Sequence, residues 1–268
     1  MRQAVAPYAD LVSPLLRIAD GAGEAVMAVY GAACADEVVH KPDGSPVTRA
    51  DLSAHRALVA GLAALTPDIP VVSEEDAKSH SRRLPRGRYW LVDPLDGTRE
   101  FLARNGEFTV NIALVEDGQP TLGVVSAPAL DEVFWGGRGL GAHRRRGASI
   151  AAIHVAPAPA ARAWRAVASR SHMDDDTRAY LRRLTPYELL RAGSSLKFCR
   201  IAEGSADVYP RLGPTCEWDT AAAQAILEAA GGVVLQLDGA PLQYGKADVL
   251  NPGFVAASTP LALTARCS

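Results

Sequence analysis

The sequence lacks long apolar runs, and it lacks an excess of charge of either sign. A membrane-spanning helix needs about 20 mainly apolar residues, and no stretch of the 268-residue sequence approaches that length. The formal net charge is −2, with acidic and basic residues interspersed, so the broad positive surface typical of proteins that bind nucleic acid polymers is missing. We therefore expect no transmembrane segment and no nucleic acid partner.

Cysteine is scarce as well. The four cysteines are widely spread and form no Cys-x-x-Cys pair, which argues against a zinc site and a redox dithiol and favours free structural thiols. The first ten residues contain one arginine and no sustained apolar stretch, so no secretory signal is visible. These features predict a cytoplasmic protein.

The sequence does contain alternating helix and strand patterns. Apolar residues recur at helical spacing over residues 10–30 and 51–65. Strand-like runs follow at 70–73, 89–92, 108–115, 121–127 and 132–135. An Ala/Pro-rich stretch at 156–161 interrupts this pattern, and strands are then predicted at 164–169, 206–209 and 233–237, with helices at 174–184, 195–203 and 218–230. We predict a layered α/β (α+β) fold in two portions, 1–157 and 158–268.

The most informative segment joins an apolar strand to two acids, a glycine and a hydroxyl at residues 93–98, DPLDGT. Two carboxylates held near one point suit hard cations that prefer oxygen ligands. A helix that begins near Thr98 would turn free backbone N–H groups toward an anion such as phosphate. Taken alone, however, such a turn is more often a capping or solvation device.

Further acids lie at the ends of other predicted elements. Glu74-Glu75-Asp76 ends an apolar strand, and Asp219 begins a helix of small residues. Adjacent carboxylates repel unless they are exposed or neutralised by cations. The alternatives are a solvated loop for the first group and a helix cap for Asp219. The recurrence of acids at element ends nevertheless favours a hard-metal site. A run of three arginines, residues 144–146, is interpreted as a solvated turn.

Three of these segments, in this order, resemble the signatures of the inositol monophosphatase superfamily of metal-dependent, lithium-sensitive phosphatases. They are Glu74-Glu75, Asp93-Pro94-Leu95-Asp96-Gly97-Thr98 and Trp218-Asp219-x-Ala221-Ala222. Other motifs resemble the 3′(2′),5′-bisphosphate nucleotidase branch: Ser45-Pro46-Val47-Thr48, Arg99-Glu100-Phe101, Ser169-Arg170-Ser171-His172, Gly193-Ser194-Ser195-Leu196-Lys197-Phe198-Cys199 and Asn251-Pro252-Gly253-Phe254. The resemblance covers nearly the whole chain and implies a five-layered αβαβα sandwich.

The resemblance also implies a metal site and a catalytic set. Two or more Mg²⁺ ions would be bound by the side chains of Glu74, Asp93, Asp96 and Asp219 and by the carbonyl of Leu95, with Li⁺ and Ca²⁺ as inhibitors. The catalytic residues would be Asp51, Glu74 and Thr98, with Thr98 and Asp51 orienting and deprotonating the attacking water. The alternative for Asp51 is a helix N-cap.

Substrate recognition, by the same resemblance, lies mainly in the second portion. His172, Ser194, Lys197 and Arg211 would hold a nucleotide and its second phosphate, since Arg grips phosphate bidentately and Lys acts as a point charge. The full implied substrate-binding set is Glu74, Leu95, Asp96, Gly97, Thr98, His172, Ser194, Lys197, Arg211 and Asp219. The alternatives are an exposed helix residue for Lys197, a satisfied loop histidine for His172 and a helix cap for Ser194.

The implied reaction converts adenosine 3′,5′-bisphosphate and water to AMP and phosphate, with 3′-phosphoadenylyl sulfate as a further substrate, in sulfur assimilation. Two other functions stay open: an inositol or sugar monophosphatase, and a non-catalytic nucleotide-binding sensor, which the complete carboxylate set disfavours. By the same resemblance, we expect a small nucleotide as the partner and a monomer or homodimer as the oligomeric state. Peripheral attachment to the cytoplasmic face of the inner membrane is the alternative to the cytoplasm, although no anchor is visible. The basic stretch 77–88 and Cys216 receive no role.

Overall fold

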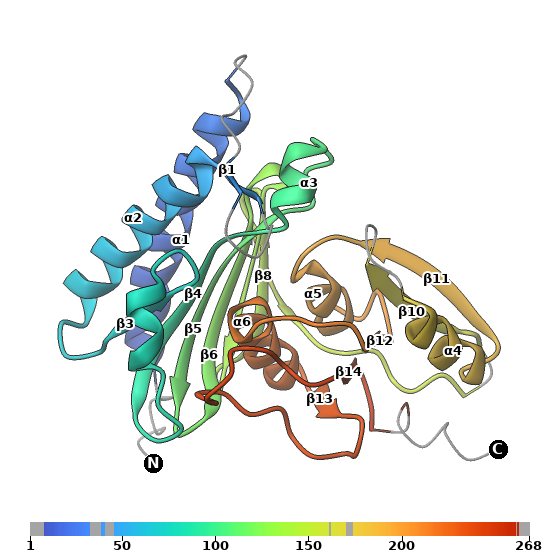
Figure 1. The fold of residues 1–268 in the computed structure, drawn as a ribbon. Coiled ribbons are helices and arrows are strands. Elements are labelled where there is room, and N and C mark those ends of the chain that lie inside the picture. Colours follow the sequence, from blue (N-terminus) through green and yellow to red (C-terminus); the bar gives the residue numbers. More distant parts are fainter. Residues whose placement is uncertain are drawn as a thin grey trace, which may run out of the picture.

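The computed structural model of the chain describes residues 8–32, 39–40, 46–160, 162–169, 174–260 and 262. Helices and sheets alternate in five layers (Figure 1). A helix pair covers a seven-stranded sheet, two further helices separate this sheet from a five-stranded sheet, and one helix covers the outside. Among the described residues, no helix is both long and apolar enough to cross a membrane.

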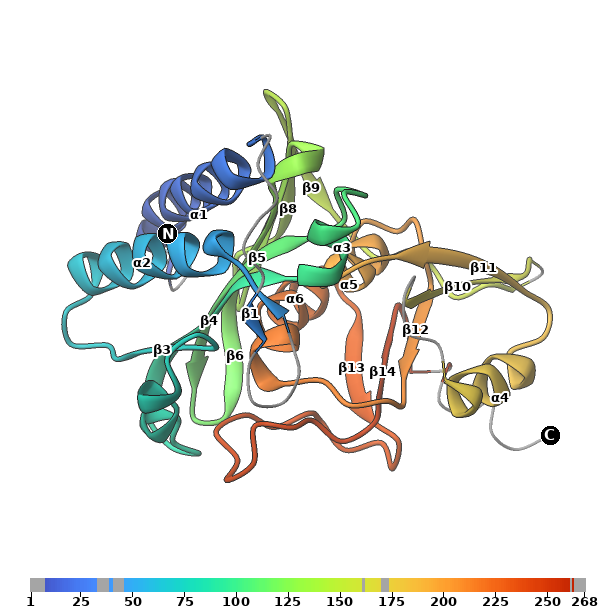
Figure 2. The ribbon, with the colours of Figure 1, turned by 45° about the horizontal axis from the view of Figure 1, so that its top comes forward.

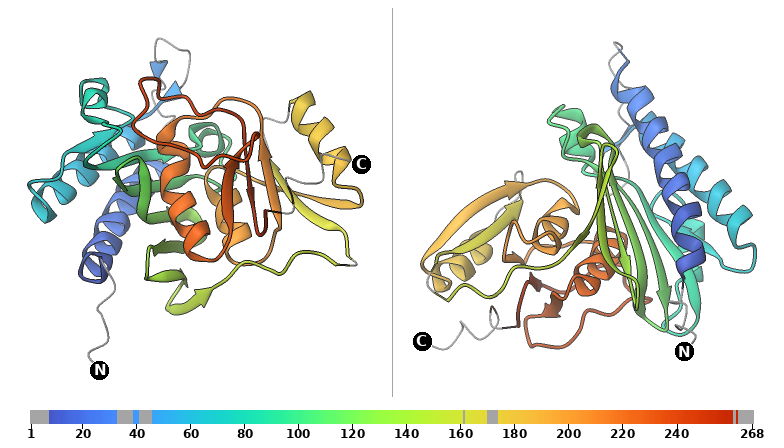
Figure 3. Two further views of the ribbon diagram at one scale, coloured as in Figure 1. Left: turned by 90° about the horizontal axis from the view of Figure 1, so that it is seen from below. Right: turned by 180° about the vertical axis from the view of Figure 1, so that it is seen from behind.

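The first layer is the helix pair α1 (Ala9–Tyr30) and α2 (Arg49–Leu65), which pack on each other and on one face of the large sheet (Figure 3). Apolar side chains at helical spacing, including Leu15, Val26, Leu58 and Leu62, are fully buried there. Both helices confirm the sequence prediction to within two residues at each end. Thr48 is the N-cap of α2, which fixes the direction from which the chain enters that helix.

The seven-stranded sheet follows the chain in the order β3-β4-β5-β6-β7-β8-β9. Only β3 and β4 pair in parallel, and all later neighbours are antiparallel. The strands are β3 (Val71–Ser73), β4 (Arg88–Asp96), β5 (Thr109–Glu116), β6 (Gln119–Ala127), β7 (Glu132–Gly137), β8 (Gly141–Arg146) and β9 (Ser149–Ile153). The short elements β1 (Val39–His40), β2 (Pro46–Val47), η1 (Ala77–Arg82), α3 (Thr98–Leu102) and η2 (Pro128–Leu130) flank this sheet.

The arginine run is a strand, so its interpretation as a solvated turn is wrong. Residues 144–146 lie in β8 and pair with β7. Their side chains form ion pairs with acids outside β8, namely Glu203, Asp20 and Glu132 respectively. Because these partners neutralise the run, three successive arginines are compatible with a regular strand.

The second sheet has the order β11-β10-β12-β14-β13 (Figure 2). Its strands are β10 (Trp164–Ser169), β11 (Tyr187–Ala192), β12 (Val208–Arg211), β13 (Val233–Gln236) and β14 (Phe254–Ala257). The helices α5 (Leu196–Ala202) and α6 (Glu217–Ala229) contact it from the inside, and α4 (Asp175–Arg183) packs on the outside. The strands β8, β9, β11 and β14 were not predicted. Four of the six residues of the edge strand β11 are exposed, so it carries no alternating apolar signal.

Helix α6 joins the two sheets, because it contacts β4, β5, β6 and β7 on one side and β13 on the other. Its alanines allow this close packing. A Cβ on Gly123 of β6 would lie 2.0 Å from the backbone oxygen of Ala222, so the absence of a side chain lets the helix approach the sheet. The predicted five-layer αβαβα order is confirmed. The division at residues 157 and 158 stays a prediction.

Candidate active site

Carboxylates from three elements meet at the ends of β3, β4 and α6. One oxygen atom from each of Glu74, Asp93 and Asp219 lies within 4.8 Å of the others. Burial raises the pKa of Asp93 and of Asp219 well above its usual value, and the neighbouring carboxylates raise it further. Asp93 is buried and the other two acids are half-buried. Such a cluster of mutually repelling oxygen donors fits a hard divalent cation such as Mg²⁺, which would neutralise it.

An irregularity in β4 directs Asp93 and Asp96 into the same cavity. Residues three apart on a regular strand point to opposite faces of the sheet. The register between β4 and β5 shifts between Asp93 and Asp96, at Pro94, which lacks a backbone N–H for the ladder. Both Asp93 and Asp96 therefore line one cavity, together with Leu95.

Local capping places Asp219, whereas Glu74 directly follows the last residue of β3. Asp219 is the third residue of α6, and its Oδ2 accepts a hydrogen bond from the backbone N–H of Cys216 at 2.8 Å. The capping alternative thus describes one oxygen of Asp219, and the side chain also lines the cavity. In the acidic run after β3, Asp76 caps η1 through Lys78 N–H, whereas Glu74 belongs to the carboxylate cluster.

Gly97 and Ser194 make a close contact at the start of α3, the helix predicted near Thr98. Gly97 has φ +87°, and a Cβ there would lie 2.1 Å from Ser194 Oγ. Ser194 Oγ lies 2.8 Å from the carbonyl oxygens of both Asp96 and Glu107. The alternative that Ser194 caps α5 is wrong, since the N-cap position belongs to Ser195.

Gly97→Ala should lower the free energy of unfolding by about 1–3 kcal/mol, because it adds a clash with Ser194 to an unfavourable φ. Gly239→Ala is the matched control: Gly239 has φ +91°, but its added Cβ would meet nothing within 4 Å. Urea unfolding of both variants separates the cost of the clash with Ser194 from the cost of the unfavourable φ. Equal losses at the two positions would show that the Ser194 contact is unimportant.

Asp51 lies behind the cavity, in contact with Thr98. Thr98 Oγ1 is 3.4 Å from Asp51 Oδ1 and 3.3 Å from the carbonyl oxygen of Leu95. The other oxygen of Asp51 accepts hydrogen bonds from Thr48 N and Oγ1, both at 2.7 Å. Thr48 holds the N-cap position, and Asp51, the third residue of α2, closes a capping box with it. The capping alternative therefore describes one oxygen of Asp51, while the other oxygen faces Thr98. Burial raises the pKa of Asp51 to about 6, which suits a group that accepts a proton near neutral pH.

Two polar residues that sequence reasoning missed hold Asp96. Ser195 donates to Asp96 Oδ2 from its backbone N at 2.7 Å, and its Oγ lies 2.8 Å from the same oxygen and from the carbonyl of Asp219. Asn111 Nδ2 donates to Ser195 Oγ at 2.8 Å. Burial raises the pKa of Asp96, while Lys197 and Ser195 act in the opposite direction. The available signal was a lone amide, Asn111, within an apolar strand.

Two cations line the same cavity. Lys197 is only 6% exposed, its Nζ donates to the Ser194 carbonyl at 2.6 Å, and the ammonium lies 5.3 Å from the Tyr209 ring centroid. The alternative of an exposed helix residue is therefore wrong. Burial lowers the pKa of Lys197 to about 8, against the opposing effect of Asp96. Arg211 Nη2 donates to the Pro214 carbonyl at 2.8 Å, and its buried Nε has no partner among the described residues.

The cavity has a volume of about 300 Å³ and brings most of the predicted set together. The predicted residues that line it are Glu74, Asp93, Leu95, Asp96, Gly97, Thr98, Ser194, Lys197, Arg211 and Asp219. Asp51 contacts it through Thr98. His172 lies outside the described residues, as do Ser45, Arg170 and Ser171 of the motifs. A cavity lined by both a carboxylate cluster and two cationic side chains can bind metal ions and an anion side by side.

Comparisons with known proteins show which proteins this chain is similar to. The model of the inositol monophosphatase family matches residues 9–267. A 3′(2′),5′-bisphosphate nucleotidase CysQ of Salmonella typhimurium is 49% identical over 245 residues, which covers 91% of this chain and 98% of the relative. The nucleotidase CysQ of Buchnera aphidicola is 40% identical and covers 94% of this chain and 95% of the relative. The crystal structure of CysQ from Bacteroides thetaiotaomicron matches with a TM-score of 0.81 at 40% identity, over 94% of this chain and 99% of that one.

Proposed function

The chain belongs to the inositol monophosphatase family, and we propose that it is a Mg²⁺-dependent 3′(2′),5′-bisphosphate nucleotidase. It hydrolyses the 3′-phosphate of adenosine 3′,5′-bisphosphate to give AMP and phosphate, and acts likewise on 3′-phosphoadenylyl sulfate in sulfur assimilation. The observation that carries the proposal is the single cavity that holds the carboxylate cluster together with Lys197 and Arg211. The names of the relatives of this chain support the choice of substrate.

Each proposed residue has a defined part in the reaction. Glu74, Asp93, Asp96, Asp219 and the Leu95 carbonyl would hold two or more Mg²⁺ ions. When bound, such ions neutralise the carboxylates, lower the pKa of a water and stabilise charge on the phosphate. Thr98 orients the attacking water, and Asp51 takes up its proton through Thr98, a relay supported by the 3.4 Å contact. Glu74 completes the proposed catalytic set.

Nucleotide recognition falls mainly to residues other than the proposed metal ligands. Lys197 and Arg211 bind the second phosphate, for which a monophosphorylated polyol has no equivalent. His172 and Ser194 contribute to the nucleotide pocket, along with the backbone around Gly97. The buried and unpartnered Nε of Arg211 supports this assignment among the described residues, since an unsatisfied buried donor is costly until an acceptor arrives.

Alkaline pH should weaken binding of the bisphosphate. The pKa of Lys197 is about 8, so its ammonium loses its proton as pH rises through that value and the attraction for the second phosphate falls. We expect KM for adenosine 3′,5′-bisphosphate to rise above pH 8, with a smaller change in kcat. The measurement is KM against pH for the native protein and for Lys197→Arg, whose charge persists. A parallel rise in both proteins would contradict this assignment.

The proposal is tested by phosphate release from adenosine 3′,5′-bisphosphate and from inositol 1-phosphate, each with Mg²⁺ and with a chelator. We expect release that depends on Mg²⁺ and strongly prefers the nucleotide. Preference for inositol phosphate would favour an inositol or sugar monophosphatase with the same metal site. No release from either substrate would favour the sensor.

Several finer properties belong to the same proposal. Li⁺ and Ca²⁺ inhibit by competing for the carboxylates. The protein is a monomer or homodimer. It acts in the cytoplasm, with peripheral attachment to the cytoplasmic face of the inner membrane as the alternative. The chain divides into a metal-binding portion, 1–157, and a nucleotide-binding portion, 158–268.

A further inference from the structure

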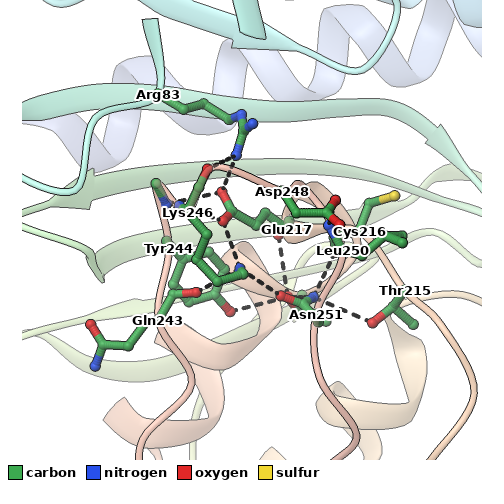
Figure 4. Close-up of polar contacts among 12 residues, drawn as sticks. Arg83, Thr215, Cys216, Glu217, Gln243, Tyr244, Lys246, Asp248, Leu250 and Asn251 are labelled. Carbon is green, nitrogen blue, oxygen red and sulfur yellow. Dashed lines mark hydrogen bonds and ion pairs between the residues drawn. The ribbon is translucent and has the colours of Figure 1, made fainter. Parts of the chain in front are cut away.

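Glu217, two residues before Asp219, is a buried acid that has no part in the proposed reaction. Its polar contacts are drawn in Figure 4. Its side chain is fully buried, yet both oxygens are satisfied. Oε2 accepts from Arg83 Nη1 and from Gly245 N, each at 3.0 Å. Oε1 accepts from the backbone N of Lys246 at 3.1 Å and from its Nζ at 2.6 Å. Such complete pairing is needed to keep a carboxylate charged away from water.

The partners of Glu217 come from two distant segments. Arg83 lies just after η1, on the connection that runs from Glu74 at the end of β3 to β4. Gly245 and Lys246 lie on the loop between β13 and β14. Glu217 itself is the first residue of α6. The ion pairs therefore tie the connection after Glu74 to the helix that carries Asp219. They also assign a structural role to one residue of the basic stretch 77–88, namely Arg83.

A second contact fixes the same helical turn. Asn251 Nδ2 lies 2.8 Å from the carbonyl oxygen of Cys216 and 3.0 Å from Thr220 Oγ1. Lys246 Nζ lies 3.3 Å from Asn251 Oδ1, so the two anchors are linked (Figure 4). Residues on both sides of Asp219 are thus held by the β13–β14 loop.

Helix geometry explains how the contacts of Glu217 orient Asp219. Residues two apart on an α-helix point about 200° apart around its axis. Glu217 is drawn toward Arg83 and Lys246, so Asp219 is turned to the other side, where it lines the cavity. The rotation of the first turn of α6 decides how close the Asp219 carboxylate comes to Glu74 and Asp93.

We propose that Glu217, clamped between Arg83 and Lys246, is a positioning residue that fixes Asp219 against Glu74 and Asp93 and so sets the affinity for the divalent cation. This inference rests on the proposed metal site and is independent of the choice of nucleotide. In Glu217→Gln, one acceptor oxygen becomes an NH₂ group that faces donors, so at least one cation contact is lost and a donor is left unpaired. The turn then relaxes, and the carboxylates of Glu74, Asp93 and Asp219 no longer converge.

The test is Mg²⁺ binding to the full chain without substrate, measured by titration calorimetry. We expect Glu217→Gln to weaken the affinity by about 10- to 100-fold, the range typical when a group that orients a metal ligand is removed. Lys246→Met, which keeps the carboxylate and the Arg83 contact, should weaken it less and provides a second variant if Glu217→Gln does not fold. Arg83→Lys, which retains the charge, should bind more tightly than Arg83→Met.

Asp207→Asn is the matched control. Asp207 is also a fully buried carboxylate with two cationic partners, Arg162 and Arg165, but it does not line the cavity. Loss of the Asp207 carboxylate should lower the midpoint temperature of thermal unfolding and leave the affinity for Mg²⁺ unchanged. If Glu217→Gln and Lys246→Met bind Mg²⁺ as tightly as the native protein, Glu217 is a structural ion-pair residue and the inference is wrong. If the native protein itself binds no Mg²⁺, the proposed metal site fails.

Discussion

Asp93→Asn should abolish Mg²⁺-dependent phosphate release, with kcat/KM lowered by about three orders of magnitude or more, equivalent to about 4 kcal/mol. Asp93 is only 1% exposed and is the buried member of the cluster that includes Glu74 and Asp219. An amide offers one weaker oxygen ligand and no charge, so it cannot replace the carboxylate toward a hard cation. Asp175→Asn is the control, since the Asp175 side chain is 97% exposed. Undiminished hydrolysis by Asp93→Asn would contradict the mechanism.

The same substitution should stabilise the metal-free protein. Burial and neighbouring acids raise the folded-state pKa of Asp93 above its ordinary 3.8, so the protonated group favours folding. That contribution is fully present below 3.8 and is lost as pH rises through the folded-state pKa. At neutral pH with chelator, the variant should melt above the native protein, and added Mg²⁺ should raise only the native midpoint. Thermal melts with and without Mg²⁺ measure both effects.

Replacement of Lys197 by Met together with Arg211 by Gln should lower kcat/KM for adenosine 3′,5′-bisphosphate by two to three orders of magnitude, or about 3–4 kcal/mol. This corresponds to two charge-assisted hydrogen-bonding groups at about 1.5–3 kcal/mol each. Turnover of inositol 1-phosphate should change only a few-fold, because that substrate has no second phosphate. The measurement is kcat/KM for both substrates.

Exposed Lys78 supplies the control, since Lys78→Met removes a positive charge away from the cavity and should alter neither substrate. The single variant Arg211→Gln keeps Lys197 beside Asp96. Any loss of nucleotide turnover in it therefore reflects recognition of the phosphate and not an indirect effect of Lys197 on the proposed metal ligands. Equal losses for the two substrates in the double variant would favour the inositol or sugar monophosphatase.

The acids that line the cavity could be chosen from the sequence, because each lies at the end of an element that the local sequence indicates. The segment from Asp93 to Thr98 places its acids at a strand end next to a glycine, and Asp219 marks a helix start. The sequence also indicates that Asp93 and Asp96 approach one point, with Pro94 between them. It does not show that the strand continues to Asp96 and that a register shift against β5 brings the two side chains to one face.

The supporting contacts could not be predicted, because they join residues far apart in the chain. Arg83 and Glu217 are 134 residues apart, and each reads as an ordinary surface charge until the fold buries both. The burial of Lys197 depends in the same way on its packing against Tyr209. The strand character of residues 144–146 depends on acids supplied by α1, by β7 and by Glu203, just after α5.

The position of the bond that breaks is the most direct test of the account, which places the 3′-phosphate at the carboxylate cluster and the 5′-phosphate at Lys197 and Arg211. Phosphorus NMR of adenosine 3′,5′-bisphosphate incubated with the enzyme and Mg²⁺ identifies the product. The account predicts adenosine 5′-monophosphate and inorganic phosphate in equal amounts. When a chelator replaces Mg²⁺, the substrate should remain unhydrolysed. Accumulation of adenosine 3′-monophosphate, or hydrolysis that persists with chelator, would contradict it.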